Sequence, residues 1–394
     1  MPRDRFDKLS QYFHVNDSTT NLPRDDPGYD RLHHVRPVLD IVKKKCLENY
    51  KPHQNTSVDE AMIAFRGRLG FRQYLPAKPT NYGVKVWMRA DSENGYANDI
   101  DVYTGKKGDE HNAQYGLTTR VVLNLTQDIA NKNHIVNIDN YFTSYQLFEV
   151  LKQNWTYARG TARSNRKGFP SSLLHPKCVK NQGDIKIVQK GKTAAYAWKD
   201  KKNIFFLSTA DDPTENAGQV KRRQKDGTQR QVPSPGVVEK YNIKMNGVDR
   251  SDQTRTAYPT YRMCKRWWTY IFFFLLDLSI SNAFILMKES PNHRLMTKTG
   301  KDKDRSLLSF RMNLSKQLLG TYRATRKRRR VSNVDPFGGG HWPKESEKKG
   351  RCRRCSKDKK RSDVKWECTG CGAHLCVFCF EKYHRGSEFN WQCT

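Results

Sequence analysis

Short apolar-rich runs separated by turn-rich connections occupy the first part of the chain after residue 56, a pattern that is typical of strands. The runs are residues 57–65, 82–90 and 96–105. Turn-forming residues, among them Pro76, Pro79 and Gly95, lie in the connections between these segments. The pattern predicts a meander of three strands. Residues 1–50 instead repeat apolar residues at helical spacing, with a break around 21–29, and so predict two helical parts.

Helices and strands alternate after the meander. We expect a helix at 117–129, a strand that ends at Asp139, a helix at 145–153 and a short strand at 156–160. A chain that begins with neighbouring strands and continues with alternating helix and strand predicts a mixed α/β sheet with one antiparallel part.

The pattern changes again beyond these elements. Residues 161–235 gain glycine, proline and charge around two strand-like runs at 184–190 and 203–209, and we interpret them as an insertion. Residues 236–258 predict a helix that carries two acidic residues, and the apolar stretch at 262–287 predicts a pair of helices. Four polar residues interrupt this stretch and make it a buried element instead of a membrane span: Asp277, Ser279, Ser281 and Asn282.

Composition and charge point to a polyanionic partner. The chain has 72 Lys and Arg against 40 Asp and Glu, a formal net charge of +32, so nucleic acid is the leading candidate. Hydrophobic residues make up 36% of the 394 residues, which is too many for a disordered chain and enough for two or three modules. The N-terminus lacks the apolar segment of a signal peptide, so we expect a cytosolic or nuclear protein.

Seven of the ten cysteines crowd into the last part of the chain. In a reducing compartment such crowding indicates metal binding and not disulfides. The pattern consists of three short-spaced pairs and a histidine: Cys352 and Cys355, Cys368 and Cys371, Cys376 and Cys379, and His384. Each pair can supply two thiolates to tetrahedral zinc from one tight turn.

Seven ligands exceed the needs of one zinc ion. The alternating spacing suggests that the first and third pairs hold one zinc, and that the second pair and His384 hold another. Cys393 or His374 is the candidate for the eighth ligand. Zinc sites with four protein ligands stabilise a fold and do not catalyse. The alternative to zinc binding is a set of free thiols without a metal.

Acidic residues near the ends of predicted strands indicate a second kind of metal site. Asp59 lies within the first strand segment, and Asp139 ends the fourth. Carboxylates from adjacent strands can converge on a divalent cation. Asp249 and Asp252 are three residues apart and would share one face of a helix. Taken alone, an acid in such a position is more often a cap or a solvated residue than a metal ligand. Asp59 is the exception, because an unpaired carboxylate inside an apolar strand is costly.

Basic residues follow the first of these acids and recur before the cysteines. Arg66, Arg68, Arg72 and Lys78 are either phosphate contacts or solvated side chains. The basic run at 325–330 is a candidate nuclear localisation signal, a contact to the DNA backbone, or both.

Several segments together resemble the piggyBac family of DNA transposases and its domesticated relatives. They are SVDEAMIAFRGR at 57–68, QYLPAKPTNYGVKVWMRAD at 73–91, IVNIDNYFTSYQLFEVL at 135–151, YNIKMNGVDRSDQ at 241–253 and KRWWTYIFFFLLDLSISNAFIL at 265–286. The motifs occur in the family order, and the cysteine-rich module follows where the family has one. The resemblance covers essentially the whole chain.

The resemblance implies an RNase H-like core whose three catalytic aspartates match Asp59, Asp139 and Asp249. Asp252 matches a fourth functionally important acid. The family implies Mg²⁺ or Mn²⁺ at these aspartates and two Zn²⁺ in the C-terminal module. It further implies a nuclear homodimer that binds terminal inverted repeats and a TTAA target in DNA, with neither a membrane nor a small-molecule substrate.

The same resemblance divides the chain into seven regions. They are a partial helical DNA-binding and dimerisation region at 1–50, the first part of the core at 51–160, an insertion domain at 161–235, the last acidic helix of the core at 236–256, a second helical DNA-binding and dimerisation region at 257–330, a linker at 331–345 and a cross-braced zinc domain at 346–394. Met1 resembles an internal methionine of the family, so we expect the chain to begin inside the helical region. Ser387 stands where the family pattern has a zinc ligand, three residues beyond His384.

Two functions of different classes are compatible with these features. One is a metal-dependent DNA transposase, which the retained aspartates favour. The other is a domesticated, catalytically inactive derivative that binds DNA or chromatin, which the expected loss of the N-terminal part favours. The charge also permits an RNA-binding protein, but no aromatic-rich recognition motif supports that reading.

Overall fold

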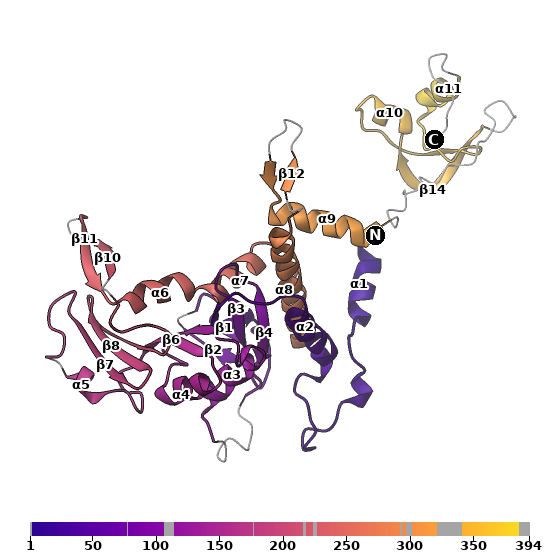
Figure 1. Ribbon diagram of the computed structural model, residues 1–394. Coiled ribbons are helices and arrows are strands. Elements are labelled where there is room, and N and C mark those ends of the chain that lie inside the picture. The colour runs from indigo at the N-terminus through magenta and orange to yellow at the C-terminus, as the bar shows by residue number, and fades with distance from the viewer. Residues whose placement is uncertain are drawn as a thin grey trace. The chain divides into compact units, whose positions relative to one another are not determined.

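The computed structural model describes residues 2–76, 78–105, 114–175, 177–215, 218–223, 227–291, 294–296, 302–320 and 341–385. The chain forms two compact units, one within Met1–Asn313 and one within Leu314–Thr394. The first unit contains a large sheet and most of the helices, and the second contains the cysteine-rich module (Figure 1).

Nine strands of the described residues form the large sheet. They are β1 (Asn55–Ala64), β2 (Gln73–Tyr74), β3 (Tyr82–Asp91), β4 (Ala97–Val102), β5 (Ile135–Ile138), β6 (Tyr157–Ala162), β7 (Ile185–Lys190), β8 (Thr193–Lys199) and β9 (Asn203–Ser208). Their order is β2-β3-β1-β5-β6-β9-β8-β7, and β4 also pairs with β3. β1, β3 and β4 are antiparallel neighbours, whereas β5 and β6 run parallel to β1. The predicted mixed α/β sheet is therefore confirmed, but it has a second antiparallel part beyond β6.

The segment interpreted as an insertion continues the same sheet. β9 pairs with β6, and β8 and β7 follow outward as antiparallel neighbours. The sequence pattern predicted β7 and β9 but missed β8. Six of the seven residues of β8 are buried, so this strand lacks the apolar and polar alternation that reveals a strand with one solvated face. β10 (Gly218–Arg223) and β11 (Gln229–Ser234) form a separate hairpin.

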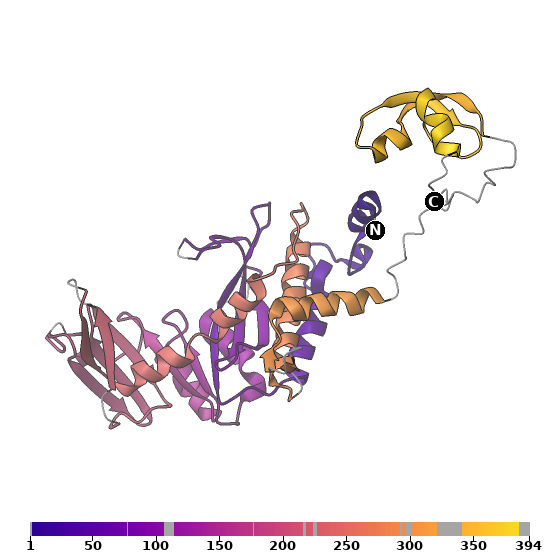
Figure 2. The same ribbon diagram turned by 90° about the horizontal axis from the view of Figure 1, so that it is seen from above.

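Helices cover both faces of the central strands. α3 (Leu117–Leu125) and α4 (Tyr145–Gln153) pack on one face, in a core that includes Val58, Val136 and Ile138. α2 (Arg36–Glu48), α7 (Gly247–Thr256) and α8 (Trp267–Glu289) pack on the other, in a core that includes Ala61 and Ile63. Figures 1 and 2 show α2 and α8 side by side. Burial of these two apolar faces is the main stabilising contribution to the first unit.

The remaining helical elements of the first unit lie around this framework. They are α1 (Arg3–Tyr12), η1 (Ser18–Thr20), η2 (His33–Val35), η4 (Gln127–Ile129), α5 (Ser171–Leu174) and α6 (Gly236–Lys244). The chain continues through the short pair β12 (Arg294–Met296) and β13 (Asp302–Asp304) into α9 (Leu307–Leu319), which crosses the boundary between the two units.

The apolar stretch at 262–287 forms the single helix α8, not the predicted pair. Its buried polar residues have partners that allow the helix to continue. Asp277 accepts hydrogen bonds from Arg311 at 2.8 Å and from the backbone of Thr260 at 3.0 Å. The Asn282 amide pairs with both the N–H and the C=O of Ala97 on β4, each at 2.9 Å. Of the described helices, α8 is long and apolar enough to span a membrane by length and composition, and its packing on the sheet accounts for that composition.

The helix predicted over 236–258 is broken into α6 and α7. The break lies at Met245 and Asn246, directly before Gly247. A Cβ at Gly247 would lie 2.5 Å from Ser57 Oγ and 2.7 Å from the carbonyl oxygen of Asp91, so only glycine allows α7 to approach the sheet this closely. The contact with the sheet, and not helix propensity, therefore decides where α7 begins.

The second unit is small and built around cysteines. It contains β14 (Pro343–Arg351) and β15 (Asp363–Cys368), which pair antiparallel, and the helices α10 (Arg353–Lys357) and α11 (Val377–Arg385). Its buried cluster consists of Cys352, Cys368, Cys371, Ala373 and Leu375. Three of these five residues are candidate ligands, so the unit has very little ordinary apolar core.

Candidate functional site

The sheet places Asp59 beside Asp139. β1 and β5 are neighbouring parallel strands in which Val58 lies opposite Ile138, the last residue of β5, so Asp59 is the next residue of β1 and Asp139 directly follows β5. Successive side chains point to opposite faces of a sheet, and Val58 and Ile138 face the core under α3 and α4. Both aspartates therefore face the side on which α7 packs. Accordingly, the charge of Asp139 is among the influences on the pKa of Asp59.

Helix α7 brings two further acids to this side of the sheet. Val248 donates its backbone N–H to Ser57 Oγ at 3.1 Å, which anchors the first turn of α7 on β1. Asp249 follows in that turn and is exposed, whereas Asp252 is partly buried and pairs with Arg255 at 3.0 Å. The three-residue spacing leaves both carboxylates on one side of the helix.

Lys78 contacts two acids of this site and lies within the electrostatic influence of two others. Its ammonium nitrogen lies 3.8 Å from Asp59 Oδ2 and 3.6 Å from Glu60 Oε1. Burial lowers the pKa of Lys78, but the negative charges around it outweigh burial and raise the pKa above its usual value. The acids that exert this effect are Asp59, Glu60, Asp249 and Asp252. We call these four residues together with Asp139 the acid cluster.

Burial perturbs the carboxyl groups of the acid cluster. It raises the pKa of Asp59 from 3.8 to about 7, an effect that the nearby Lys78 charge only partly offsets. Burial likewise raises the pKa of Asp139, against a hydrogen bond that its carboxylate accepts from the backbone of Tyr141. It also raises the pKa of Asp252 despite the charge of Arg255. Carboxyl groups that are costly to ionise alone are suited to bind a cation that compensates their charge.

The raised pKa of Asp59 predicts a specific pH dependence of stability. Between about pH 4 and pH 7 the folded chain holds a proton on Asp59 that the unfolded chain has lost, so stability falls as the pH rises through this window. In Mg²⁺-free buffer, Asp59→Asn is expected to stabilise the first unit at pH 8 by on the order of 3 kcal/mol and to have little effect near pH 4. Urea unfolding at both pH values measures the difference. The same substitution at the exposed Asp25 is the control and should change neither value.

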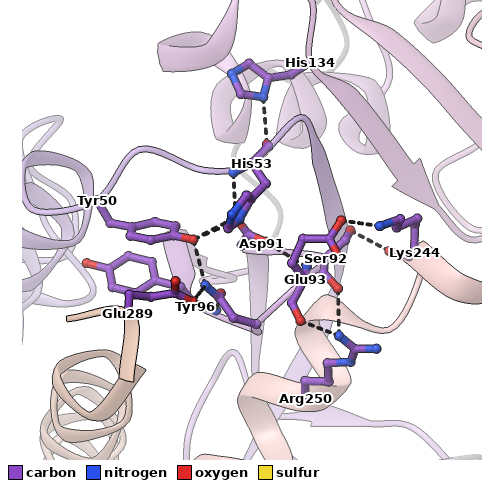
Figure 3. Close-up of polar contacts among 11 residues, drawn as sticks. Tyr50, His53, Asp91, Ser92, Glu93, Tyr96, His134, Lys244, Arg250 and Glu289 are labelled. Atoms are coloured by element: carbon purple, nitrogen blue, oxygen red, sulfur yellow. Dashed lines mark hydrogen bonds and ion pairs between the residues drawn. The ribbon is translucent and has the colours of Figure 1, made fainter. Parts of the chain in front are cut away.

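A polar network at the turn between β3 and β4 fixes the approach to α7 (Figure 3). The fully buried carboxylate of Asp91 accepts hydrogen bonds from the backbone and ring of His53 at 2.7 and 3.0 Å, and from Tyr50 at 3.1 Å. Ser92 Oγ donates to the carbonyl oxygen of Lys244 at the end of α6, and Arg250 of α7 donates to the carbonyl of Ser92. The turn thereby holds both ends of the α6–α7 junction.

Basic residues border the acid cluster at Asp139. Arg163 donates to the side chain of Asn140 at 2.9 Å, and Arg166 donates to the backbone carbonyl of Asn140 at 2.8 Å. These bonds attach the loop after β6 to the residue that follows Asp139. Arg163 and the neighbouring Lys167 are exposed there. A polyanion that reaches the acid cluster would meet positive charge at this border.

The first cysteine group lies in the second unit. It joins the first and third pairs of the sequence pattern: Cys352, Cys355, Cys376 and Cys379. Their ligand atoms lie within 4.8 Å of one another, which is the proximity that one tetrahedral ion requires. Burial raises the pKa of Cys352, but backbone N–H groups of Cys355 and Cys376 outweigh it and lower the pKa to about 7. The thiolate form is thus favoured at Cys352, whereas contacts with the neighbouring thiols raise the pKa of Cys355, and burial raises that of Cys379.

The second group joins the remaining pair to two histidines. It consists of Cys368, Cys371, His384 and His341, again with ligand atoms within 4.8 Å. Sequence reasoning missed His341, because it stands in the expected linker at 331–345 and outside the short-spaced pairs. His374, one of the two candidates for this position, instead hydrogen bonds through its ring to the carbonyl oxygen of Lys348. The other candidate, Cys393, lies outside the described residues, as does Ser387.

The two kinds of site suit two kinds of metal. The acid cluster offers only oxygen ligands, which Mg²⁺ and Mn²⁺ prefer, and the ammonium of Lys78 shows that a cation is accommodated among them. The second unit offers six thiolates and two imidazoles, the ligands that zinc prefers. The chemistry of each set of donors therefore fits the metal that the sequence suggested for it.

Sequence comparison places the chain among transposases. A sequence model of the family described as Transposase IS4 matches residues 1–284. The human PiggyBac transposable element-derived protein 3 is 27% identical over 398 residues, which cover 98% of this chain and 63% of that protein. The human PiggyBac transposable element-derived protein 5 is 26% identical over 333 residues, which cover 81% of this chain and 60% of that protein. The chain thus spans less than two thirds of the length of these curated relatives.

Structural comparison gives the same fold. A cryo-EM structure of a piggyBac transposase synaptic complex with hairpin DNA has a TM-score of 0.69 to this chain at 24% identity, covering 95% of this chain and 78% of that chain. Because the family model matches most of the chain and the human relatives align along nearly all of it, the chain belongs to the Transposase IS4 family and is of the piggyBac type.

Proposed function

We propose that the chain is a metal-dependent DNA transposase of the piggyBac type that cuts and rejoins DNA strands at TTAA targets. The observation that carries this proposal is the acid cluster, in which aspartates from two adjacent parallel strands meet the acids of α7 around a single cation. The strand order β4-β3-β1-β5-β6, three antiparallel strands followed by two parallel ones, supports an RNase H-like core.

In this proposal Asp59, Asp139 and Asp249 hold the divalent metal, with Asp252 as a fourth acid beside them. Mg²⁺ or Mn²⁺ bound there would lower the pKa of an attacking water or 3′-hydroxyl and stabilise charge on the phosphate in the transition state. The strands β1 and β5 hold two of the carboxylates in fixed register. The α6–α7 junction, anchored on the β3–β4 turn, sets the position of the other two.

DNA is the proposed substrate. The net charge of +32 favours DNA, and the exposed basic side chains of Arg163 and Lys167, beside the acid cluster, would bind phosphates of the DNA strand. The structural neighbour is a transposase in complex with DNA, which supports the same substrate here. We propose that two copies of the chain hold two inverted-repeat ends. We also propose that the second unit, with one zinc at each of its two groups in a cross-braced arrangement, adds a DNA-binding surface.

The nucleus is the proposed location of the protein, because its DNA substrate lies there. The basic run at 325–330, a candidate localisation signal, lies outside the described residues.

The proposal is tested with a plasmid that carries the genomic segment around the gene together with its flanking TTAA sites. Purified full-length chain and Mg²⁺ should release this segment by breaks at the TTAA sequences, and the same plasmid with both TTAA sites altered should stay intact. The curated relatives are named as transposable element-derived proteins, so the alternative is a domesticated, inactive DNA- or chromatin-binding derivative. Salt-sensitive binding without any strand break would favour that alternative.

A further inference from the structure

Lys78 reaches the acid cluster from a short turn between β2 and β3. The turn is closed by a hydrogen bond from the N–H of Leu75 to the carbonyl oxygen of Asn81 at 2.8 Å. The Lys78 side chain is 30% exposed, and its ammonium donates to the carbonyl oxygen of Glu60 at 3.3 Å. Lys78 therefore lies at the entrance of the cluster and is not sealed inside it.

The environment of Lys78 differs from that of the other lysine at this site. Lys85 is buried, with its ammonium 3.7 Å from Glu60 Oε2 and 4.4 Å from the centre of the Tyr141 ring. Lys78 lies 3.6–3.8 Å from its carboxylates, about as far as Lys85 lies from Glu60, and these distances exceed the 2.7–2.9 Å of a charge-assisted hydrogen bond. The two lysines differ in burial: the Lys85 side chain is 8% exposed and packs on an aromatic ring, whereas the Lys78 side chain is 30% exposed and balances charge at the rim of the cluster.

A divalent metal and the Lys78 ammonium would compete for the same carboxylate. A metal ligated by Asp59 would place two positive charges within a few ångströms of the ammonium, in a partly buried site where such repulsion is only weakly screened. The Lys78 side chain is already 30% exposed, so the ammonium can leave towards solvent. The nearest replacement for the lost carboxylate would be a phosphate of the bound DNA strand.

We propose that Lys78 is a resident cation that neutralises the acid cluster before metal binds, and that it moves from Asp59 to a DNA phosphate when metal enters. This inference rests on the metal site of the proposed function. The movement of Lys78 couples metal binding to DNA binding. Bound metal frees the Lys78 ammonium to bind a DNA phosphate, and a DNA phosphate that holds the ammonium keeps it from competing with the metal for Asp59. By linkage, each ligand strengthens the binding of the other.

Mn²⁺ titration of the full-length chain, followed by the paramagnetic resonance of free Mn²⁺, tests this role without relying on activity. Without DNA, Lys78→Met is expected to bind Mn²⁺ at least about tenfold more tightly than the parent, because it lacks the competing charge. Lys78→Arg should stay near the parent affinity. Lys192→Met, at the exposed turn between β7 and β8, is the matched control and should not differ from the parent.

A second titration adds a duplex oligonucleotide. DNA should tighten Mn²⁺ binding several-fold in the parent and distinctly less in Lys78→Met. A purely structural role for Lys78 gives the opposite result, weaker Mn²⁺ binding together with a lower unfolding temperature. Equal or weaker binding by both Lys78→Met and Lys78→Gln therefore overturns the inference while the metal site stands. A parent that binds no Mn²⁺, or that binds it no better than Asp59→Asn, overturns the proposed metal site and this inference with it.

Discussion

Asp139→Asn is expected to lower the rate of strand cleavage by about 10³-fold or more while DNA binding stays within about twofold of the parent. Asp139 lies next to Asp59 on the neighbouring parallel strand, so its loss removes an anionic ligand from the centre of the acid cluster. Asparagine has nearly the same shape and keeps an acceptor for the N–H of Tyr141. Single-turnover cleavage of a labelled TTAA substrate and a parallel binding titration measure the two quantities.

The same substitution at the other acids refines this prediction. Asp59→Asn and Asp249→Asn should resemble Asp139→Asn, and Asp252→Asn should be milder if Arg255 remains its principal partner. Asp99→Asn is the control, because Asp99 lies on β4 and pairs with Lys43 at 3.3 Å, away from the cluster. Cleavage at the parent rate by Asp139→Asn would contradict the assignment of the catalytic site.

Chelation of zinc is expected to unfold residues 341–385 while the first unit remains folded. The buried cluster of the second unit consists largely of cysteines, and the unit is too small to be stable from apolar burial alone. The purified chain should contain two zinc ions. Hydrogen exchange before and after chelation should show loss of protection within residues 341–385 only, in β14, β15, α10 and α11, with the large sheet unchanged.

Two histidine substitutions distinguish the possible eighth ligands. His341→Ala should lower the zinc content from two ions towards one, because it removes a ligand from the group of Cys368, Cys371 and His384. His374→Ala should keep two ions, because the His374 ring bonds to the carbonyl of Lys348 instead. A chain that still binds two zinc ions after His341→Ala would contradict the assignment of His341.

Local features of the sequence are sufficient for several elements. Short runs of apolar residues bounded by turn-forming residues locate β1, β3 and β4, because turn residues mark the ends of each strand. The helix α4 begins after Ser144, whose side chain accepts a hydrogen bond from the N–H of Leu147 at 3.2 Å. Paired cysteines within single turns likewise predict which pairs share an ion, since short spacing constrains which side chains can meet.

Other features depend on contacts between residues far apart in the chain. The split between α6 and α7 follows from the close approach of Gly247 to β1 and β3, and α8 remains one helix because Arg311 and Ala97 satisfy its buried Asp277 and Asn282. No local pattern reveals these partners. His341 belongs to the same class, because it enters its site from a segment without a signature of its own, and the sequence marked Lys78 as basic without placing it beside Asp59. Spacing along the chain constrains only neighbouring residues, whereas burial, charge and ligand geometry are set where distant segments meet.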